Sequence, residues 1–252
     1  MCIPANVIAN ADDLGMRPSV NKAILYCFEQ GYINSTSIMV NTGYFEEAVD
    51  FVHDHSSITN IGVHVNLAAG KPISNFYQPA YLTDDGNWNF TKINIKLSVL
   101  SAADKAAFSN EIHAQIDKAL ANKIPLTHID SHRHIHNLPC FYKLFLEAAK
   151  HYNLKIRLAQ TYNEGNYLNF YYRKYINNAF RKGENNYSDY FEDVQHFLKN
   201  GMRAGENSVV EIMLHPDFDA TDKLIDHFDK NSLKNWIAFL EDLKIKDLVI
   251  KR

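Results

Sequence analysis

The sequence has few cysteines, no long apolar run and no signal-peptide pattern among its first residues. Its three cysteines are an odd number without a Cys-x-x-Cys pair, so we expect neither a disulfide framework nor a thiolate zinc site. No apolar stretch reaches the roughly 18 residues that a membrane helix needs. The N-terminus also lacks the basic and long apolar regions of a signal peptide. These absences favour a cytoplasmic protein in a reducing compartment.

The net charge is low, and charged residues of both signs are spread along the chain. The chain carries 26 Lys and Arg residues against 29 Asp and Glu residues, and no basic run is longer than a dipeptide. This balance lacks the electrostatic footprint of a nucleic-acid or anionic-membrane partner, so the expected partner is a small, nearly neutral molecule. The 252 residues suffice for a single domain spanning residues 1–252, and a homodimer is expected from base rates alone.

Short β-branched stretches alternate with amphipathic helices along the chain. This alternation is typical of a parallel sheet with helical crossovers, and it predicts an α/β fold. We expect strands over residues 7–10, 35–40, 61–65, 126–130, 155–158, 209–214 and 248–250, and helices over 19–30, 45–53, 101–123, 141–151 and 232–243.

Two stretches do not follow this alternation of strands and helices. Residues 68–98 show no clear periodicity, and we interpret them as a loop or small insertion beside the mouth of the active site. Residues 162–200 are rich in Asn and Tyr. Tyrosines of this kind can stack on sugar rings, but they more often fill the edge of a core, which is the interpretation we favour.

Polar residues follow four of the expected strands. Because parallel strands present their carboxyl ends at one edge of a sheet or one mouth of a barrel, these residues should converge there. Aspartates and histidines that converge in this way suggest a hydrolase with a single divalent metal ion. The four runs are Asn10-Ala11-Asp12-Asp13, Gly62-Val63-His64, Asp130-Ser131-His132-Arg133-His134-Ile135-His136 and Leu214-His215-Pro216.

The adjacent carboxylates Asp12 and Asp13 need a particular backbone. Neighbouring strand residues point to opposite sides, so both can serve one site only if the chain turns, and Gly15 and Pro18 are expected to supply that turn. Capping of the next helix would account for one aspartate but hardly for two.

The histidine run offers more imidazoles than one metal ion needs. An extended backbone would place His132, His134 and His136 on one side. Some of them should therefore contact substrate or support a ligand, and Asp130 could orient a ligand imidazole through its distal N–H.

Together these residues resemble the YdjC-like carbohydrate deacetylase family, which includes chitooligosaccharide deacetylases. Arg133 stands where family members often carry another histidine. The matching fragments are Asn10-Ala11-Asp12-Asp13-Leu14-Gly15, Ser35-Thr36-Ser37, Val40-Asn41, Gly62-Val63-His64-Val65-Asn66-Leu67, Gly70-Lys71-Pro72, Thr127-His128-Ile129-Asp130-Ser131-His132-Arg133-His134-Ile135-His136 and Glu211-Ile212-Met213-Leu214-His215-Pro216.

The resemblance implies a distorted (β/α) barrel related to the polysaccharide deacetylases, formed by a single metal-dependent deacetylase domain. It implies that Asp13, His64 and His132 bind one divalent ion, with Asp12 in the place of the general base and His215 in that of the general acid. Three protein ligands would leave positions open for water and a substrate carbonyl. We therefore expect a carbohydrate N-deacetylase that acts on N-acetylated sugars, such as short chitooligosaccharides. Two imidazoles and a carboxylate suit zinc, while the family resemblance also allows magnesium.

Two alternatives remain open. A metallophosphoesterase of the histidinol-phosphatase type also clusters His and Asp on a barrel, but it usually gathers two or three metals and has its His-x-His pair near the N-terminus. Here the His-x-His run follows the fourth expected strand, and no phosphate-cradling glycine loop accompanies it. The other alternative is a carbohydrate-binding module that has lost catalysis, and the presence of all five proposed site residues argues against it.

Overall fold

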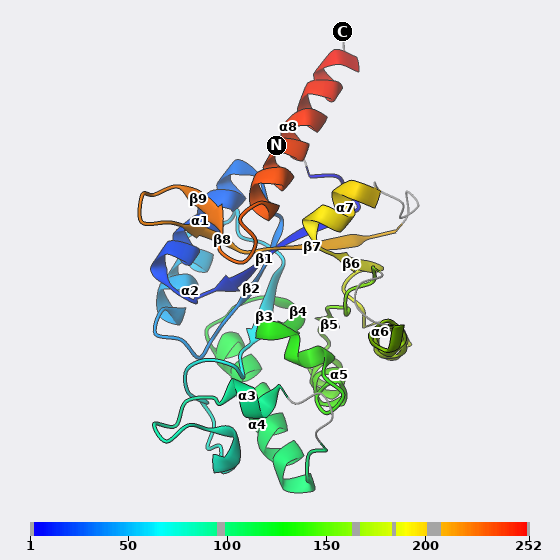
Figure 1. Ribbon diagram of the computed structural model, residues 1–252. Coiled ribbons are helices and arrows are strands. Elements are labelled where there is room, and N and C mark those ends of the chain that lie inside the picture. The colour runs from blue at the N-terminus through cyan, green and yellow to red at the C-terminus, as the bar shows by residue number, and fades with distance from the viewer. Residues whose placement is uncertain (1–2, 95–98, 163–166, 183–184, 201–207, 251–252) are drawn as a thin grey trace.

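The computed structural model describes residues 3–94, 99–162, 167–182, 185–200 and 208–250 (Figure 1). Its centre is a curled, all-parallel sheet in the order β5-β4-β3-β2-β1-β7-β6. The strands are β1 (Val7–Leu14), β2 (Ser35–Ile38), β3 (Ile61–Val65), β4 (Leu126–Ser131), β5 (Lys155–Ile156), β6 (Tyr190–Glu192) and β7 (Val210–Leu214).

Helices connect successive strands, as the alternating pattern predicts (Figure 1). A separate antiparallel hairpin of β8 (Pro216–Phe218) and β9 (Leu224–Asp226) follows β7. The α-helices are α1 (Pro18–Gln30), α2 (Phe45–Asp54), α3 (Phe90–Ile93), α4 (Ala102–Ala121), α5 (Tyr142–His151), α6 (Tyr167–Arg181), α7 (Val194–Asn200) and α8 (Ser232–Ile250), and the 3₁₀ turns are η1 (Pro79–Tyr81) and η2 (His132–Asn137). None of the helices in the described part of the chain is long and apolar enough to cross a membrane.

The two edges of the curled sheet are joined by hydrogen bonds. The Ile156 N–H of β5 donates to the Asn185 carbonyl at 2.5 Å, and the Tyr187 N–H donates back to the Ile156 carbonyl at 2.9 Å. Further along, the Thr161 N–H donates to the Phe191 carbonyl of β6 at 3.0 Å. The sheet is therefore a half-barrel, which confirms the predicted α/β class and the distorted barrel.

The two faces of the sheet differ in chemistry. Successive strand residues point to opposite faces, so apolar residues such as Val63 and Ile129 alternate with polar ones such as His64 and Asp130. The apolar face packs beneath the helices, and the polar face lines the barrel interior. Both kinds of residue are buried. The interior set is Asn10, Asp12, Ser35, Ser37, His64, His128, Asp130, Arg157 and Glu211.

Gly62 shows how tightly this interior is filled. A Cβ atom on Gly62 would lie 2.4 Å from the imidazole of His128, so a larger residue would displace that ring. The His128 ring in turn stacks on Tyr187 with centroids 4.0 Å apart. The glycine that precedes His64 by two positions is thus required by packing.

Two predictions about elements need correction. The strand expected at residues 248–250 is wrong, because helix α8 (Ser232–Ile250) continues to the end of the described chain. No Gly or Pro interrupts residues 232–250, and a short apolar triplet cannot distinguish a strand from the last turn of a helix. The strand expected to end at Asn10 instead runs to Leu14, so Asp12 and Asp13 belong to β1 itself.

The excursion over residues 68–98 is folded where it is described. Its Trp88 ring lies 4.8 Å from Phe76, and both rings pack against Phe108 of α4. Residues 95–98 lie outside the described chain. Phe90 and Asn94 reach the lining of the candidate site, as expected for an insertion beside its mouth.

Candidate metal and acid–base centre

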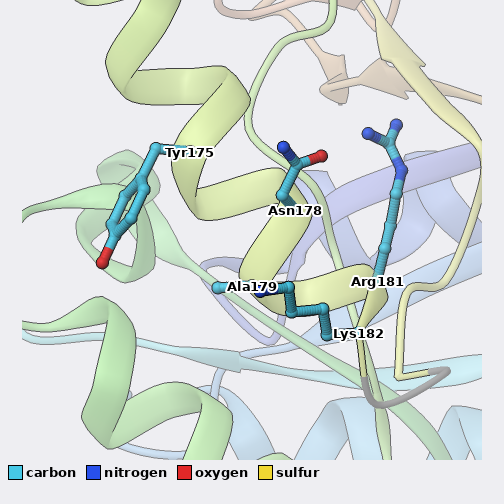
Figure 2. Close-up of a pocket in the computed structure, with 5 residues that line it drawn as sticks. All are labelled: Tyr175, Asn178, Ala179, Arg181 and Lys182. Atoms are coloured by element: carbon cyan, nitrogen blue, oxygen red, sulfur yellow. The ribbon is translucent and has the colours of Figure 1, made fainter.

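A hollow of about 500 Å³ lies along the outer helix α6 (Figure 2). Its lining contains no carboxylate or imidazole; Figure 2 shows Tyr175 pointing to one side of the helix and Arg181 to the other. Since no acid–base pair or set of metal ligands faces this hollow, it does not qualify as a reaction site. Its lining residues are Tyr175, Asn178, Ala179, Arg181 and Lys182.

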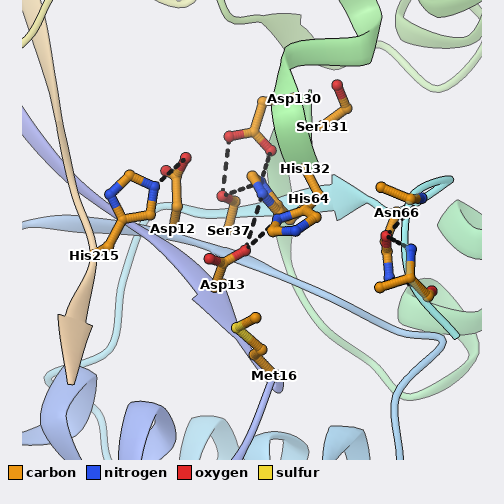
Figure 3. Close-up of polar contacts among 12 residues, drawn as sticks. Asp12, Asp13, Met16, Ser37, His64, Asn66, Asp130, Ser131, His132 and His215 are labelled. Atoms are coloured by element: carbon orange, nitrogen blue, oxygen red, sulfur yellow. Dashed lines mark hydrogen bonds and ion pairs between the residues drawn. The ribbon is translucent and has the colours of Figure 1, made fainter. Parts of the chain in front are cut away.

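A second cavity, of about 450 Å³, opens at the carboxyl ends of the central strands. It brings together all five site residues predicted from the sequence (Figure 3). They come from β1 and β3 and from the turns that follow β4 and β7. The lining residues are Asp12, Asp13, Met16, His64, Phe90, Asn94, Ser131, His132, Arg133, His134, Met213, His215, His227 and Phe228.

The two aspartates reach this cavity because β1 changes direction at Asp13. Asp13 has a positive φ of 71°, which is unusual for a residue other than glycine. The change therefore occurs at the aspartate itself, before the expected turn at Gly15. A strained backbone of this kind is often found at functional sites.

Asp13 lies between two of the predicted ligand histidines. Its Oδ1 atom is 2.8 Å from Nδ1 of His132 and 3.3 Å from Nε2 of His64. The potential ligand atoms of these three residues all lie within 4.8 Å of one another. A carboxylate and two imidazoles are suitable donors for a divalent zinc-like ion, so the residues fit the predicted metal.

Protonation of this cluster depends on its neighbours. Burial would raise the pKa of Asp13, but hydrogen bonds from His132, His227 and His64 hold it well below its ordinary value. Burial would lower the pKa of His64, but the Asp130 and Asp13 carboxylates raise it to about 10. A cation that binds here must therefore displace a proton from His64, and metal affinity should fall at acid pH.

The orientation of the His64 ring is fixed by contacts to its Nδ1 atom. Its Nδ1 atom lies 2.7 Å from Oδ1 of Asp130 and 3.0 Å from the Ser37 hydroxyl, which itself donates to the other oxygen of Asp130 at 3.0 Å. These contacts turn Nε2 toward Asp13. The arrangement agrees with the expectation that Asp130 orients a ligand imidazole.

A second group of potential ligands, Asp12, His64 and Asp130, is less suitable for a cation. The Arg157 guanidinium lies 2.7 Å from both carboxylates, so it already occupies their oxygens and would repel a divalent ion. The cluster around Asp13 is therefore the better metal site.

Asp12 is held by Arg157 in a bidentate pair. Two guanidinium nitrogens of Arg157 lie 2.7 Å from the two carboxylate oxygens, and the Asn10 amide donates to Oδ1 of Asp12 at 2.8 Å. Burial would raise the pKa of Asp12, but the charges of Arg157 and His64 and the hydrogen bond from Arg157 together outweigh it and lower that pKa. Asp12 is therefore a fixed, ionised carboxylate at neutral pH.

Arg157 itself was not identified from the sequence. It is fully buried and donates from Nε to Glu211 at 2.6 Å. The signal that could have revealed it is a charged residue between the apolar residues Ile156 and Leu158 of the expected strand over 155–158.

His215 lies on the side of Asp12 opposite to the metal cluster (Figure 3). Its Nε2 atom is 4.0 Å from Oδ2 of Asp12, and its Nδ1 atom is 3.9 Å from Asp226. Burial lowers the pKa of His215, while Asp12 and Asp226 oppose that effect. The ring is thus placed to exchange a proton next to Asp12.

The prediction that an extended backbone places three imidazoles on one side is wrong. Residues 132–137 form the 3₁₀ turn η2, in which Arg133 and His134 have left-handed φ values of 60° and 52°. His132 and His134 line the cavity, whereas His136 is buried behind it with Nδ1 2.7 Å from the Ser131 hydroxyl. The left-handed pair breaks the two-residue period that the prediction assumed.

One further cavity residue, His227, carries no sequence motif. It follows β9 and places its Nε2 atom 3.3 Å from Oδ2 of Asp13, the oxygen that faces away from His132. Its position depends on how the β8–β9 hairpin folds back over the cavity, which no local pattern in the sequence indicates.

Comparisons with known proteins show the family of this chain. The sequence model of the YdjC-like protein family matches residues 6–248. A carbohydrate deacetylase of Thermoanaerobacter pseudethanolicus is 31% identical over 214 residues, covering 84% of this chain and 81% of that protein. A carbohydrate deacetylase of Brevibacillus brevis is 31% identical over 215 residues with the same shares covered.

A solved structure shares the fold. A provisionally assigned cellobiose-phosphate cleavage protein from Enterococcus faecalis superposes with a TM-score of 0.67 and 24% identity, over 85% of this chain and 82% of that one. With the family match extending over nearly the whole sequence, this chain belongs to the YdjC-like family.

Proposed function

We propose that this chain is a carbohydrate deacetylase that removes the acetyl group from an N-acetylated sugar with the help of one divalent metal ion. Residues 1–252 form a single domain for this reaction. The relatives named carbohydrate deacetylase support the substrate class. The observation that carries the proposal is the ionised Asp12, held by Arg157 between a His/Asp cluster and His215.

Asp13, His64 and His132 would hold the ion. When bound, it supplies Lewis acidity for the acetyl carbonyl and for a water molecule. The donor set of two imidazoles and one carboxylate favours zinc over magnesium, which prefers oxygen ligands.

Two side chains move the protons of amide hydrolysis. Asp12 accepts a proton from the attacking water, since Arg157 keeps it ionised and in a fixed orientation. His215 donates a proton to the departing sugar amine through Nε2, which faces Asp12 at 4.0 Å. Asp226 lies 3.9 Å from the other ring nitrogen and favours the charged form of the imidazole.

The size of the cavity favours a short sugar. A volume of about 450 Å³ lies within the range of roughly 300–1,000 Å³ that is usual for small-molecule sites. Short chitooligosaccharides are the substrate that we propose. The phosphoesterase alternative is less well supported, because the described cavity lining contains a single cationic side chain of Lys or Arg, Arg133.

Acetate release from a panel of N-acetylated sugars, with elemental analysis of the same preparation, tests this proposal. We expect equal amounts of acetate and free amine, one divalent ion per chain, loss of activity on chelation and recovery on adding zinc. Asp12→Asn is the matched inactive control. Acetate release that survives complete metal removal, or an absence of acetate release from every sugar, would contradict the proposal.

A further inference from the structure

An apolar ring stands at the rim of the proposed active site. Phe228 is 71% exposed and also lines the cavity that contains Asp12, Asp13 and His215. Single exposed apolar side chains are common on protein surfaces, so exposure alone says little. The position of Phe228 and the way it is held distinguish it from other exposed rings.

The turn that presents Phe228 is rigidly anchored. The buried carboxylate of Asp226 accepts hydrogen bonds from the backbone N–H groups of Phe228 at 3.0 Å and Asp229 at 2.9 Å. Its other oxygen accepts from the His215 N–H at 2.8 Å, and the His227 N–H donates to the His215 carbonyl at 3.0 Å. One buried side chain therefore fixes the positions of both Phe228 and His215.

The ring of Phe228 lies next to the proposed acid. Its centroid is 5.0 Å from that of His215, with the planes inclined by 33°. The other phenyl ring of the cavity, Phe90, is half-buried and has the Arg133 guanidinium over its face at 5.6 Å. Phe228 therefore offers the more accessible aromatic face at the rim.

We propose that Phe228 is the platform on which the sugar ring of the substrate stacks, and therefore a specificity-determining residue. The inference rests on the proposed function. A pyranose ring has a face of C–H groups that packs on an aromatic ring while its hydroxyl groups stay in water. A ring stacked on Phe228 brings its acetamido nitrogen toward His215, which is the group that must protonate it.

Binding of N,N′-diacetylchitobiose tests the platform without relying on turnover. Calorimetric titrations use the zinc-loaded protein with Asp12→Asn, which slows hydrolysis, alone and combined with Phe228→Ala or Phe228→Trp. We expect Phe228→Ala to weaken binding about tenfold, since the apolar contact is lost, and Phe228→Trp to restore it. Tyr77→Ala is the matched control, because Tyr77 is 78% exposed and does not line the cavity.

Kinetics with Asp12 intact separate sugar binding from damage to His215. With Phe228→Ala, we expect the ratio of kcat/KM for diacetylchitobiose to that for 4-nitrophenyl acetate, an ester without a sugar ring, to fall about tenfold, mainly through KM. Equal losses for both substrates would mean that the ring merely supports His215, and unchanged affinity for diacetylchitobiose would also overturn the inference. Acetate release by the protein with Phe228 intact decides the proposed function separately.

Discussion

Asp12 and Asp13 are neighbours in sequence and have the same side chain, yet their surroundings differ. Asp12 is bonded to the Arg157 guanidinium and the Asn10 amide, which keep their protons at all relevant pH values. Asp13 is surrounded by imidazoles, which can lose a proton and become metal ligands. In the mechanism that we propose, the neighbours, rather than the carboxylate itself, decide which residue accepts protons and which binds an ion.

Removing an imidazole from the Asp13 side should have the largest effect. His64→Ala and His132→Ala should each lower metal affinity and turnover by more than about 10²-fold, because losing even an outer partner of a ligand costs 10–100-fold. Elemental analysis and acetate release measure this, with the exposed His53→Ala as control. If both variants keep stoichiometric metal, the ligand assignment is wrong, and His134 becomes the next candidate.

Replacing Arg157, the positively charged partner of Asp12, should mainly reduce the stability of the fold. Arg157→Met leaves Asp12, Asp130 and Glu211 buried together without the guanidinium charge, which should lower the free energy of unfolding by about 3–5 kcal/mol. Denaturant unfolding measures this loss. Arg157→Lys keeps the charge and should lose less; equal stability of Arg157→Met and the unaltered protein would show that the interior does not depend on this residue.

The proposed acid should affect the pH dependence of catalysis. For kcat/KM we expect a bell-shaped profile. The midpoint of its acid limb lies below the ordinary pKa of Asp, because Arg157 lowers the pKa of Asp12. The midpoint of its basic limb lies below the ordinary pKa of His, because burial lowers the pKa of His215. His215→Gln should remove the basic limb and lower kcat by roughly 10²-fold. A full bell-shaped profile in that variant would exclude His215 as the acid.

The smallest expected effect concerns the third carboxylate around Arg157. One guanidinium cannot compensate three carboxylates, and burial raises the pKa of Glu211 from 4.5 to about 7. The raised pKa favours the protonated form in the folded state, so the stability contributed by Glu211 is fully present below pH 4.5 and is lost as pH rises to about 7. Glu211→Gln should flatten that decline, by up to about 1.4 kcal/mol per pH unit. An unaltered slope of the unfolding free energy would contradict this assignment.

The sequence predicts the parts of the site that lie at strand ends. His64 follows an apolar β-branched run, and His215 directly follows another, so their convergence could be inferred from parallel topology. Arg157 and His227 could not be inferred in the same way. Their roles depend on which strands face each other across the barrel and on how the hairpin after β7 folds back.

Backbone conformation set the other limit. The positive φ values of Asp13, Arg133 and His134 are strained backbone conformations that the tertiary structure stabilises. The residue types at these positions do not predict them. Consequently the histidines of η2 could be identified, but which of them face the cavity could not.

The central claim is that Asp12 accepts the proton while Asp13 holds the ion, and the paired variants Asp12→Asn and Asp13→Asn test it most directly. Both keep the size of the side chain while removing its charge. Metal content and acetate release are measured on each. We predict that Asp12→Asn keeps the ion and loses about 10²–10⁴-fold in kcat with little change in KM, whereas Asp13→Asn loses the ion. Loss of the ion from Asp12→Asn with its retention in Asp13→Asn would contradict the account.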